Sequence, residues 1–170
     1  FFINAMKPEW RKDPSKPIDL SAEDPAVFET YAQYLYTHKV VFKGSAGNSF
    51  NHVAALYVLG GFLKDVSFQN FITGALIRHC NATQRFPPET AVEIIYQGTT
   101  SGSPFRRLLV DIWAYAASSG WIASRGLVAS TSVDFVEDVV KALLEVREKP
   151  AGSRPRPWVA EPKSYNVSIP

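Results

Sequence analysis

The segment FETYAQYLYTHKV, from Phe28 to Val40, decides the interpretation of the fold because it is rich in aromatic residues and ends on a basic pair. Such a run is compatible with a catalytic cluster, a platform that stacks nucleic-acid bases, or one side of a packed helix. Phe28, Tyr31 and Leu35 recur at spacings of three and four residues, which is the period of one helical face. We therefore predict a helix that buries these three side chains.

The flanking residues support this helix. Asp24 is suited to the N-cap, and Pro25 to the first helical position. Tyr34 and Tyr36 lie off the predicted buried face, so we expect them at the rim of the core, where their hydroxyl groups reach water or a partner. The tyrosines of the segment are accordingly interpreted as mostly structural.

Further helices are predicted from the same period, with Gly, Pro and Asn clusters between them. Two short apolar runs, residues 18–20 and 40–42, are predicted as strands, and residues 43–51 as a mobile loop. The fold class is therefore predicted as mainly α with one or two short strands, formally α+β. The later helices are expected from His52, after Asp65, from Phe86-Pro87-Pro88 to Gly98, from Pro104 to Gly120 with Ser103 as N-cap, and after Ser132.

The composition fits one intracellular domain. The chain has 170 residues, 46% of them hydrophobic, which suffices for a proper core. A single cysteine, Cys80, excludes an internal disulfide and favours a reducing compartment, cytoplasm or nucleus. No apolar run approaches the roughly 18 to 20 residues of a membrane helix, so we expect no membrane partner.

No motif supplies a complete catalytic or metal-binding set. His79 and Cys80 are adjacent, but neighbouring helical residues point about 100 degrees apart, which favours a helix-end histidine beside a buried cysteine. His38 and His52 lack a third ligand at zinc-site spacing. The loops at residues 44–49 and 98–103 do not end in the Gly-Lys-Ser/Thr of a phosphate-binding loop. We therefore predict no enzymatic activity, no cofactor and no metal.

Charge disfavours nucleic acid as a partner. The 18 basic and 16 acidic residues give a formal charge of +2, close to balance. Basic residues concentrate only at Arg106-Arg107 and at Arg154 and Arg156. We expect Arg106 and Arg107 on the polar side of their helix, solvated or in ion pairs. A helical nucleic-acid-associated regulator that uses these arginines is the alternative from a different functional class.

Several blocks resemble the BTB/POZ family, particularly BTB proteins of filamentous fungi. They are the opening FF, IDLSAEDPAVFETYAQYLYTHKV at residues 18–40, LYVLGGFLKD with FQN at residues 56–70, and SPFRRLLVDIWA at residues 103–114. The resemblance implies a partial BTB/POZ-like fold over residues 1–80, without its N-terminal strands and first helix, and a C-terminal helical extension over residues 81–148. Residues 149–170, rich in proline and arginine, are predicted as a disordered tail.

The resemblance implies a non-enzymatic protein-interaction module with a protein partner. Many members of the family form homo- or heterodimers through the complete domain, and some bind cullin-type ubiquitin-ligase scaffolds. It therefore implies, as an alternative, a substrate adaptor for a cullin-type ligase, with Phe50 and His52 as candidates for the cullin contact. We expect the missing strands to lie upstream of Phe1. Trp113 and Trp121 are further candidate anchors, and the candidate partner-binding surface consists of Tyr34, Tyr36, His38, Lys39, Phe50 and His52.

Overall fold

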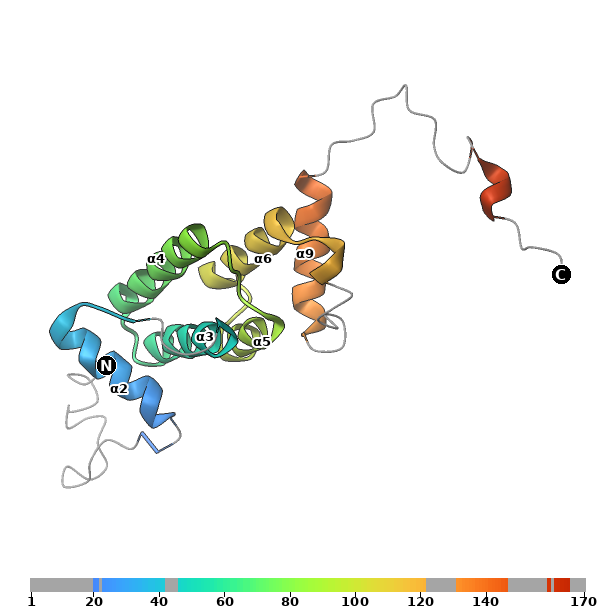
Figure 1. The fold of residues 1–170 in the computed structure, drawn as a ribbon. Coiled ribbons are helices and arrows are strands. Elements are labelled where there is room, and N and C mark those ends of the chain that lie inside the picture. The colour runs from blue at the N-terminus through green and yellow to red at the C-terminus, as the bar shows by residue number, and fades with distance from the viewer. Residues whose placement is uncertain are drawn as a thin grey trace.

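The computed structural model describes residues 20–21, 23–41, 46–121, 131–146, 159 and 161–165 of the chain. Within these ranges the protein is mainly helical and contains no strand. Figure 1 shows α2 at one end of the helical body, followed by α3, α4 and α5, with α6 and α9 at the other end. The elements are α2 (Pro25–Thr37), α3 (Ala46–Phe62), α4 (Val66–Thr83), α5 (Glu89–Gly98), α6 (Pro104–Ala116), α9 (Val133–Val146) and the 3-10 helix η2 (Pro162–Tyr165).

Helix α2 begins as its sequence predicts. The Asp24 Oδ1 atom accepts a hydrogen bond from the Ala26 amide at 2.8 Å, and Pro25 lies in the first turn. The helix ends at His38, whose φ of 50° is left-handed and whose amide donates to the Tyr34 carbonyl at 2.8 Å. The predicted N-cap is therefore confirmed.

Helices α3 and α4 pack on each other as a hairpin around a tight turn. Asp65 caps α4, because its Oδ1 atom accepts a hydrogen bond from the Phe68 amide at 2.9 Å. A Cβ atom on Gly60 would lie 2.9 Å from Cγ of Gln69, so the last turn of α3 approaches α4 at a distance that favours glycine. The predicted start of α3 at His52 is wrong, because the helix begins at Ala46, inside the predicted loop.

Helix α3 is the centre of the body, since α2, α4 and α5 all pack on it. The end of α5 lies very close to α3, because a Cβ atom placed on Gly98 would lie 2.5 Å from Cγ2 of Val58. Helix α6 then packs on α5, and α9 packs on α6. The predicted end of α6 at Gly120 is too late, because the helix stops at Ala116 and the Ala117 amide caps it through the Trp113 carbonyl at 3.1 Å.

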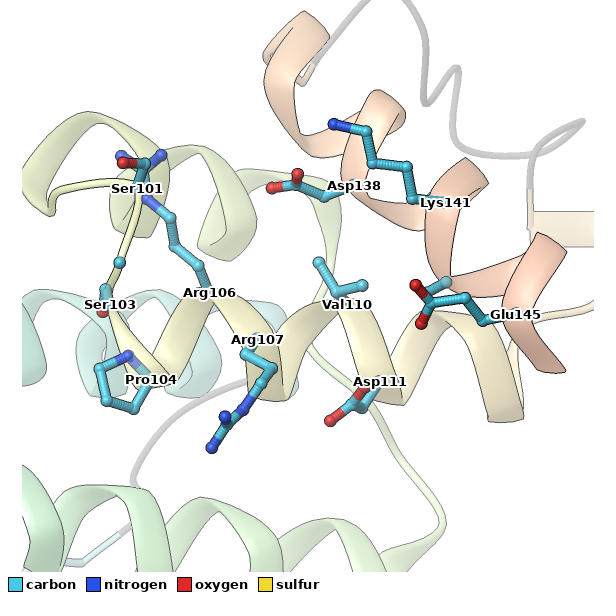
Figure 2. Close-up of a pocket in the computed structure, with 12 residues that line it drawn as sticks. Ser101, Ser103, Pro104, Arg106, Arg107, Val110, Asp111, Asp138, Lys141 and Glu145 are labelled. Carbon is cyan, nitrogen blue, oxygen red and sulfur yellow. The ribbon is translucent and has the colours of Figure 1, made fainter.

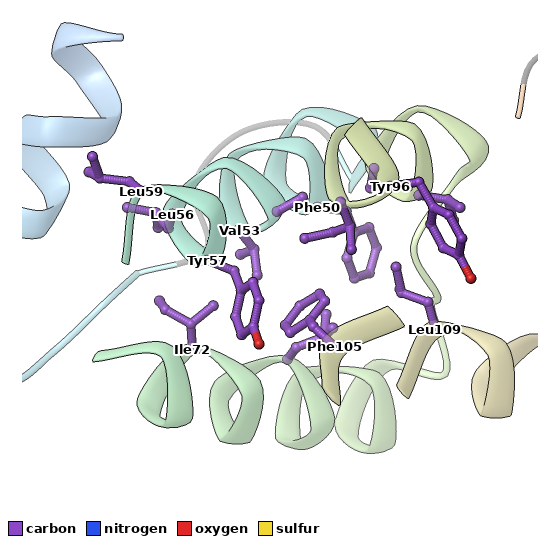
Figure 3. Close-up of a cluster of buried hydrophobic side chains, with 14 of the residues drawn as sticks. Phe50, Val53, Leu56, Tyr57, Leu59, Ile72, Tyr96, Phe105 and Leu109 are labelled. Carbon is purple, nitrogen blue, oxygen red and sulfur yellow. The ribbon is translucent and has the colours of Figure 1, made fainter. Parts of the chain in front are cut away.

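One cluster of buried side chains connects the helices from α2 to α9. Figure 3 shows part of it, where Tyr57 of α3, Ile72 of α4 and Phe105 of α6 point toward one another. The Tyr57 and Phe105 ring centroids are 4.2 Å apart. Each such side chain contributes roughly 1.5 to 3 kcal/mol through burial. The boundary that we predicted between a BTB/POZ-like core and its helical extension, at residues 80–81, lies inside α4. The largest fully buried side chains are Trp113, Phe68, Phe105, Phe135, Leu56, Leu59, Leu63, Ile72, Leu76, Ile95, Leu109 and Val53.

The buried face of α2 differs from the prediction by one helical position. Tyr31 is buried as expected, but Tyr34 is only 8% exposed and Leu35 is 47% exposed. The Tyr34 ring lies 4.7 Å from the ring of Phe68 and 4.8 Å from that of Phe71, measured between centroids. The aromatic side chains of α4 therefore select Tyr34 over Leu35.

The predicted strands are not found among the residues that the structure describes. Val40 and Val41 have no regular secondary structure, and Leu20 is likewise not in a strand. A short strand without a paired neighbour is unstable in water, which agrees with the lack of strand structure at these three described residues. Residues 18, 19 and 42 lie outside the described part, as does most of the predicted tail, where η2 is the described helical element.

Candidate functional site

A cleft between α2 and the start of α3 contains two of the six residues in the predicted surface. Its volume is about 270 Å³. Lys39 and His52 both line it, together with polar side chains from the outer side of α2 and the two valines that follow that helix. The complete lining consists of Thr30, Gln33, Thr37, Lys39, Val40, Val41 and His52.

The other predicted surface residues divide between surface and core. Tyr36 is 89% exposed, and His38 is also exposed. Tyr34 and Phe50 are buried, so their rings serve packing: Phe50 makes an edge contact with the His79 ring at 5.5 Å between centroids. The structure therefore does not bring the six residues together as one exposed surface.

His52 connects α3 to α2 by a side-chain hydrogen bond. Its Nε2 atom lies 2.9 Å from the Thr30 hydroxyl oxygen, and the same hydroxyl donates to the Ala26 carbonyl at 3.0 Å. Because a hydroxyl has one proton, a Thr30 that donates to Ala26 must accept from His52 Nε2. This geometry gives the half-buried His52 a structural role at the cleft.

Cys80 is in an environment that suppresses thiol chemistry. The side chain is buried, and desolvation raises the pKa of the Cys80 thiol from 9.0 to about 11. The thiolate is the reactive form, so it is scarce at neutral pH. Within the described ranges, no three His, Cys, Asp or Glu side chains are grouped so that they could hold a metal ion.

A second and larger hollow, of about 470 Å³, lies between α6, α9 and the loop that precedes α6. Figure 2 shows Arg106, Arg107 and Asp111 from α6 and Asp138, Lys141 and Glu145 from α9 around it. Lys141 Nζ forms an ion pair with Glu137 Oε1 at 2.8 Å. The hollow therefore has charges of both signs rather than a basic lining.

Arg106 does not lie on the polar side of α6 as predicted. It is only 8% exposed, and its guanidinium group donates hydrogen bonds to carbonyl groups at the C-terminal end of α5. The Nη2 atom donates to the Tyr96 carbonyl at 2.5 Å and to the Thr99 carbonyl, and Nε donates to the Thr99 hydroxyl at 3.0 Å. The last carbonyls of a helix carry partial negative charge, so a buried cation is well placed there.

Tyr96 extends this arrangement from α6 to α9. The Arg106 guanidinium carbon lies 4.3 Å from the centre of the Tyr96 ring, and the Tyr96 hydroxyl donates to Asp138 Oδ2 at 2.8 Å. Burial, followed by the hydrogen bond to Asp138, raises the pKa of Tyr96. The prediction from sequence missed this connection, because nothing in the sequence shows that the end of α5 faces both α6 and α9.

The tryptophans proposed as additional anchors pack against each other. Trp113 is buried, and its ring centroid lies 5.1 Å from that of Trp121, which also contacts Phe86. Neither is an isolated exposed anchor of the kind that dominates many interfaces.

Comparisons with protein-family models, with curated proteins and with solved structures gave no match for this chain. None of the described helices combines the length and the apolar character that crossing a bilayer requires.

Proposed function

We propose that this chain is a non-enzymatic protein-interaction module. The observation that carries the proposal is an apolar face on α9 that is directed away from α6. Val133 is 80% exposed and Leu144 57% exposed, and Val140 and Leu143 are exposed as well. Contiguous exposed apolar side chains on a folded scaffold are typical of interaction sites.

Helical geometry makes these side chains contiguous. Val133, Val140 and Leu144 are separated by seven and four residues, so they lie along one side of the helix. The opposite side carries Phe135 and Val139, which are buried in the core. Helix α9 thus buries one apolar face in the core and exposes a second apolar face to solvent.

The resemblance to the BTB/POZ family gives this proposal its finer form. It predicts a BTB/POZ-like module with a helical extension, and a cullin-type ligase adaptor as the alternative. Because Phe50 is buried, a cullin contact through its ring would require α3 to open. Recovery of a purified cullin by the chain with its flanking sequence would support the adaptor role, and failure at about micromolar concentration would remove it.

The alternative of a nucleic-acid-associated regulator loses one of its main residues. Arg106 is buried and donates to carbonyl groups, so it is not available to phosphate oxygens, and Arg107 alone remains exposed in that pair. Arg107 by itself does not make the basic patch that such binding needs, and Arg154 and Arg156, the other arginines of this alternative, lie outside the described residues.

A photo-crosslinking experiment tests the proposed function. A photoreactive amino acid at position 144 should capture a distinct protein in the native cell, whereas the same group at exposed position 97 should not. The captured protein is identified by mass spectrometry and mixed with the purified chain. Binding of the wild type with loss of about tenfold in affinity for Leu144→Asp supports an interaction module. Crosslinks no different from those at position 97 would refute it.

A further inference from the structure

The cleft between α2 and the start of α3 combines a cation with a small apolar surface. Its volume of about 270 Å³ accommodates a small molecule or the end of a chain. Among the described lining residues, Lys39 is the one with a full side-chain charge other than histidine, and it forms no ion pair with any described residue. Val40 is half-buried against the core, and Val41 is 61% exposed. The cleft therefore suits an anionic group next to a small apolar one.

The threonine hydroxyls of the cleft are already used within the protein. The Thr30 hydroxyl donates to a backbone carbonyl and accepts from His52. The Thr37 hydroxyl donates to the Gln33 carbonyl at 2.8 Å and accepts from the Lys39 amide at 3.2 Å. A ligand must therefore find its hydrogen-bond partners among the other side chains of the cleft.

Two acceptor atoms of the cleft receive no hydrogen bond from the described part of the chain. Because the Nε2 proton of His52 points to Thr30, the Nδ1 atom of the neutral ring is an acceptor. The Gln33 side chain donates from Nε2 to Glu29 at 3.2 Å, which leaves its Oε1 atom as an acceptor. Glu29 itself is not among the described lining residues. A complementary ligand therefore brings hydrogen-bond donors as well as a negative charge.

We infer that this cleft binds the C-terminal end of a peptide chain whose last residue is small and apolar. The terminal carboxylate pairs with Lys39, and amide groups of the last residues donate to Gln33 and His52. The last side chain packs on the two valines. Capture of a terminal carboxylate is a recurring mode of peptide recognition. The cleft lies at the α2 end of the body and α9 at the other (Figure 1), so this inference goes beyond the proposed function and does not depend on the α9 face.

A free amino acid is a poorer occupant of the cleft. Its ammonium group would bring a second positive charge close to Lys39, and the described lining residues supply no carboxylate to balance it. A peptide amide donates a hydrogen bond without that charge. Charge complementarity therefore favours the end of a chain over a single amino acid.

The test uses peptides of about six residues that differ only at the C-terminal end. The first ends in valine with a free carboxylate, the second is the same peptide with a terminal amide, and the third ends in glycine with a free carboxylate. Free valine is the fourth ligand. Amide chemical shifts of the full chain are followed by NMR up to about 5 mM ligand, a range that detects weak binding. Urea midpoints verify that each variant is folded.

We expect the valine peptide with a free carboxylate to shift the amides of Lys39, Val40 and Val41 in a saturable way. The amidated peptide should bind at least about tenfold more weakly, a comparison that needs no variant. Lys39→Met should weaken the free peptide about tenfold and remove its difference from the amidated one. Lys64→Met, the matched change at an exposed lysine outside the described lining, should preserve that difference. The glycine peptide should bind about threefold more weakly, because it lacks the apolar side chain.

Equal binding of the free and amidated peptides to the wild type would overturn the inference. The absence of saturable shifts up to about 5 mM, or shifts confined to residues outside the cleft, would also overturn it. Free valine that binds as tightly as the peptide, through the same amides, would overturn it in favour of a single amino acid. None of these failures affects crosslinking at position 144, so the proposed function is tested separately.

Discussion

Replacement of Arg106 by methionine should destabilise the protein strongly, because the guanidinium group satisfies the end of α5. Methionine retains much of the apolar stem but leaves the Tyr96 and Thr99 carbonyls without their charged donor. Hydrogen bonds from a charged donor contribute about 1.5 to 3 kcal/mol each. The contact with the Tyr96 ring at 4.3 Å adds about 1 kcal/mol.

The sum is reduced by the desolvation of the buried arginine, which methionine avoids, and by water that reaches the half-buried Thr99. We therefore expect a loss of about 3 kcal/mol in the free energy of unfolding. Arg107→Met is the matched control, since Arg107 is exposed on the next position of α6 and should change stability by less than about 0.5 kcal/mol.

Urea unfolding followed by tryptophan fluorescence measures both variants, with linear extrapolation to water. A difference between Arg106→Met and Arg107→Met of less than about 1 kcal/mol would refute the reasoning that the buried arginine closes α5. Arg106→Lys should lie between the two, because lysine keeps the charge but cannot donate to several acceptors from a planar fork.

Three other predictions concern separate contacts. Gly98→Ala should lower the free energy of unfolding by about 1 to 3 kcal/mol, because the added Cβ atom would collide with Val58. An unchanged urea midpoint would show that α3 and α5 move apart enough to accommodate the methyl group. Tyr96→Phe should cost about 1.5 kcal/mol in the same assay by removing the hydrogen bond to Asp138, and no coupling to Asp138→Asn in a double-mutant cycle would contradict this. Cys80 should react with iodoacetamide at pH 8 only as the chain unfolds. Because burial raises the pKa of its thiol from 9.0 to about 11, the stability that comes from keeping this thiol protonated is fully present below pH 9 and is lost between pH 9 and pH 11.

Much of the helical fold follows from local sequence. The cap at Asp24 with Pro25, and the start of α4 after Asp65, depend on neighbouring atoms only, so the sequence is sufficient to predict them. Ser103 shows the limit of this reasoning. It occupies the N-cap position of α6 but makes no capping hydrogen bond, and its hydroxyl lies 3.4 Å from that of Tyr57. At this position the contact with Tyr57, which is distant in sequence, competes with the local capping hydrogen bond.

The errors arise where distant residues decide the outcome. On α2, two stripes have nearly equal helical spacing, and only packing against Phe68 and Phe71 selects Tyr34 over Leu35. The start of α3 was missed because Gly, Ser and Asn are turn formers. Ser49 and Phe50 are nevertheless buried against the body.

The candidate site was only partly predictable for the same reason. Exposed Tyr36 and Lys39 follow from their positions at the end of α2, whereas the burial of Arg106 depends on where α5 ends in space. The exposed apolar face of α9 could have been predicted from sequence, since Val133, Val140 and Leu144 recur there at helical spacing.

Asp65 suggests the order in which the helices assemble. One of its oxygens starts α4, and the other accepts from the Tyr31 hydroxyl of α2 at 3.0 Å. We expect the α3–α4 hairpin, whose contacts are close in sequence, to form in the folding transition state, and α2 to dock afterwards onto a carboxylate that is already fixed. Tyr31→Phe should then accelerate unfolding in stopped-flow measurements and leave the refolding rate unchanged, and slower refolding would place α2 in the nucleus instead.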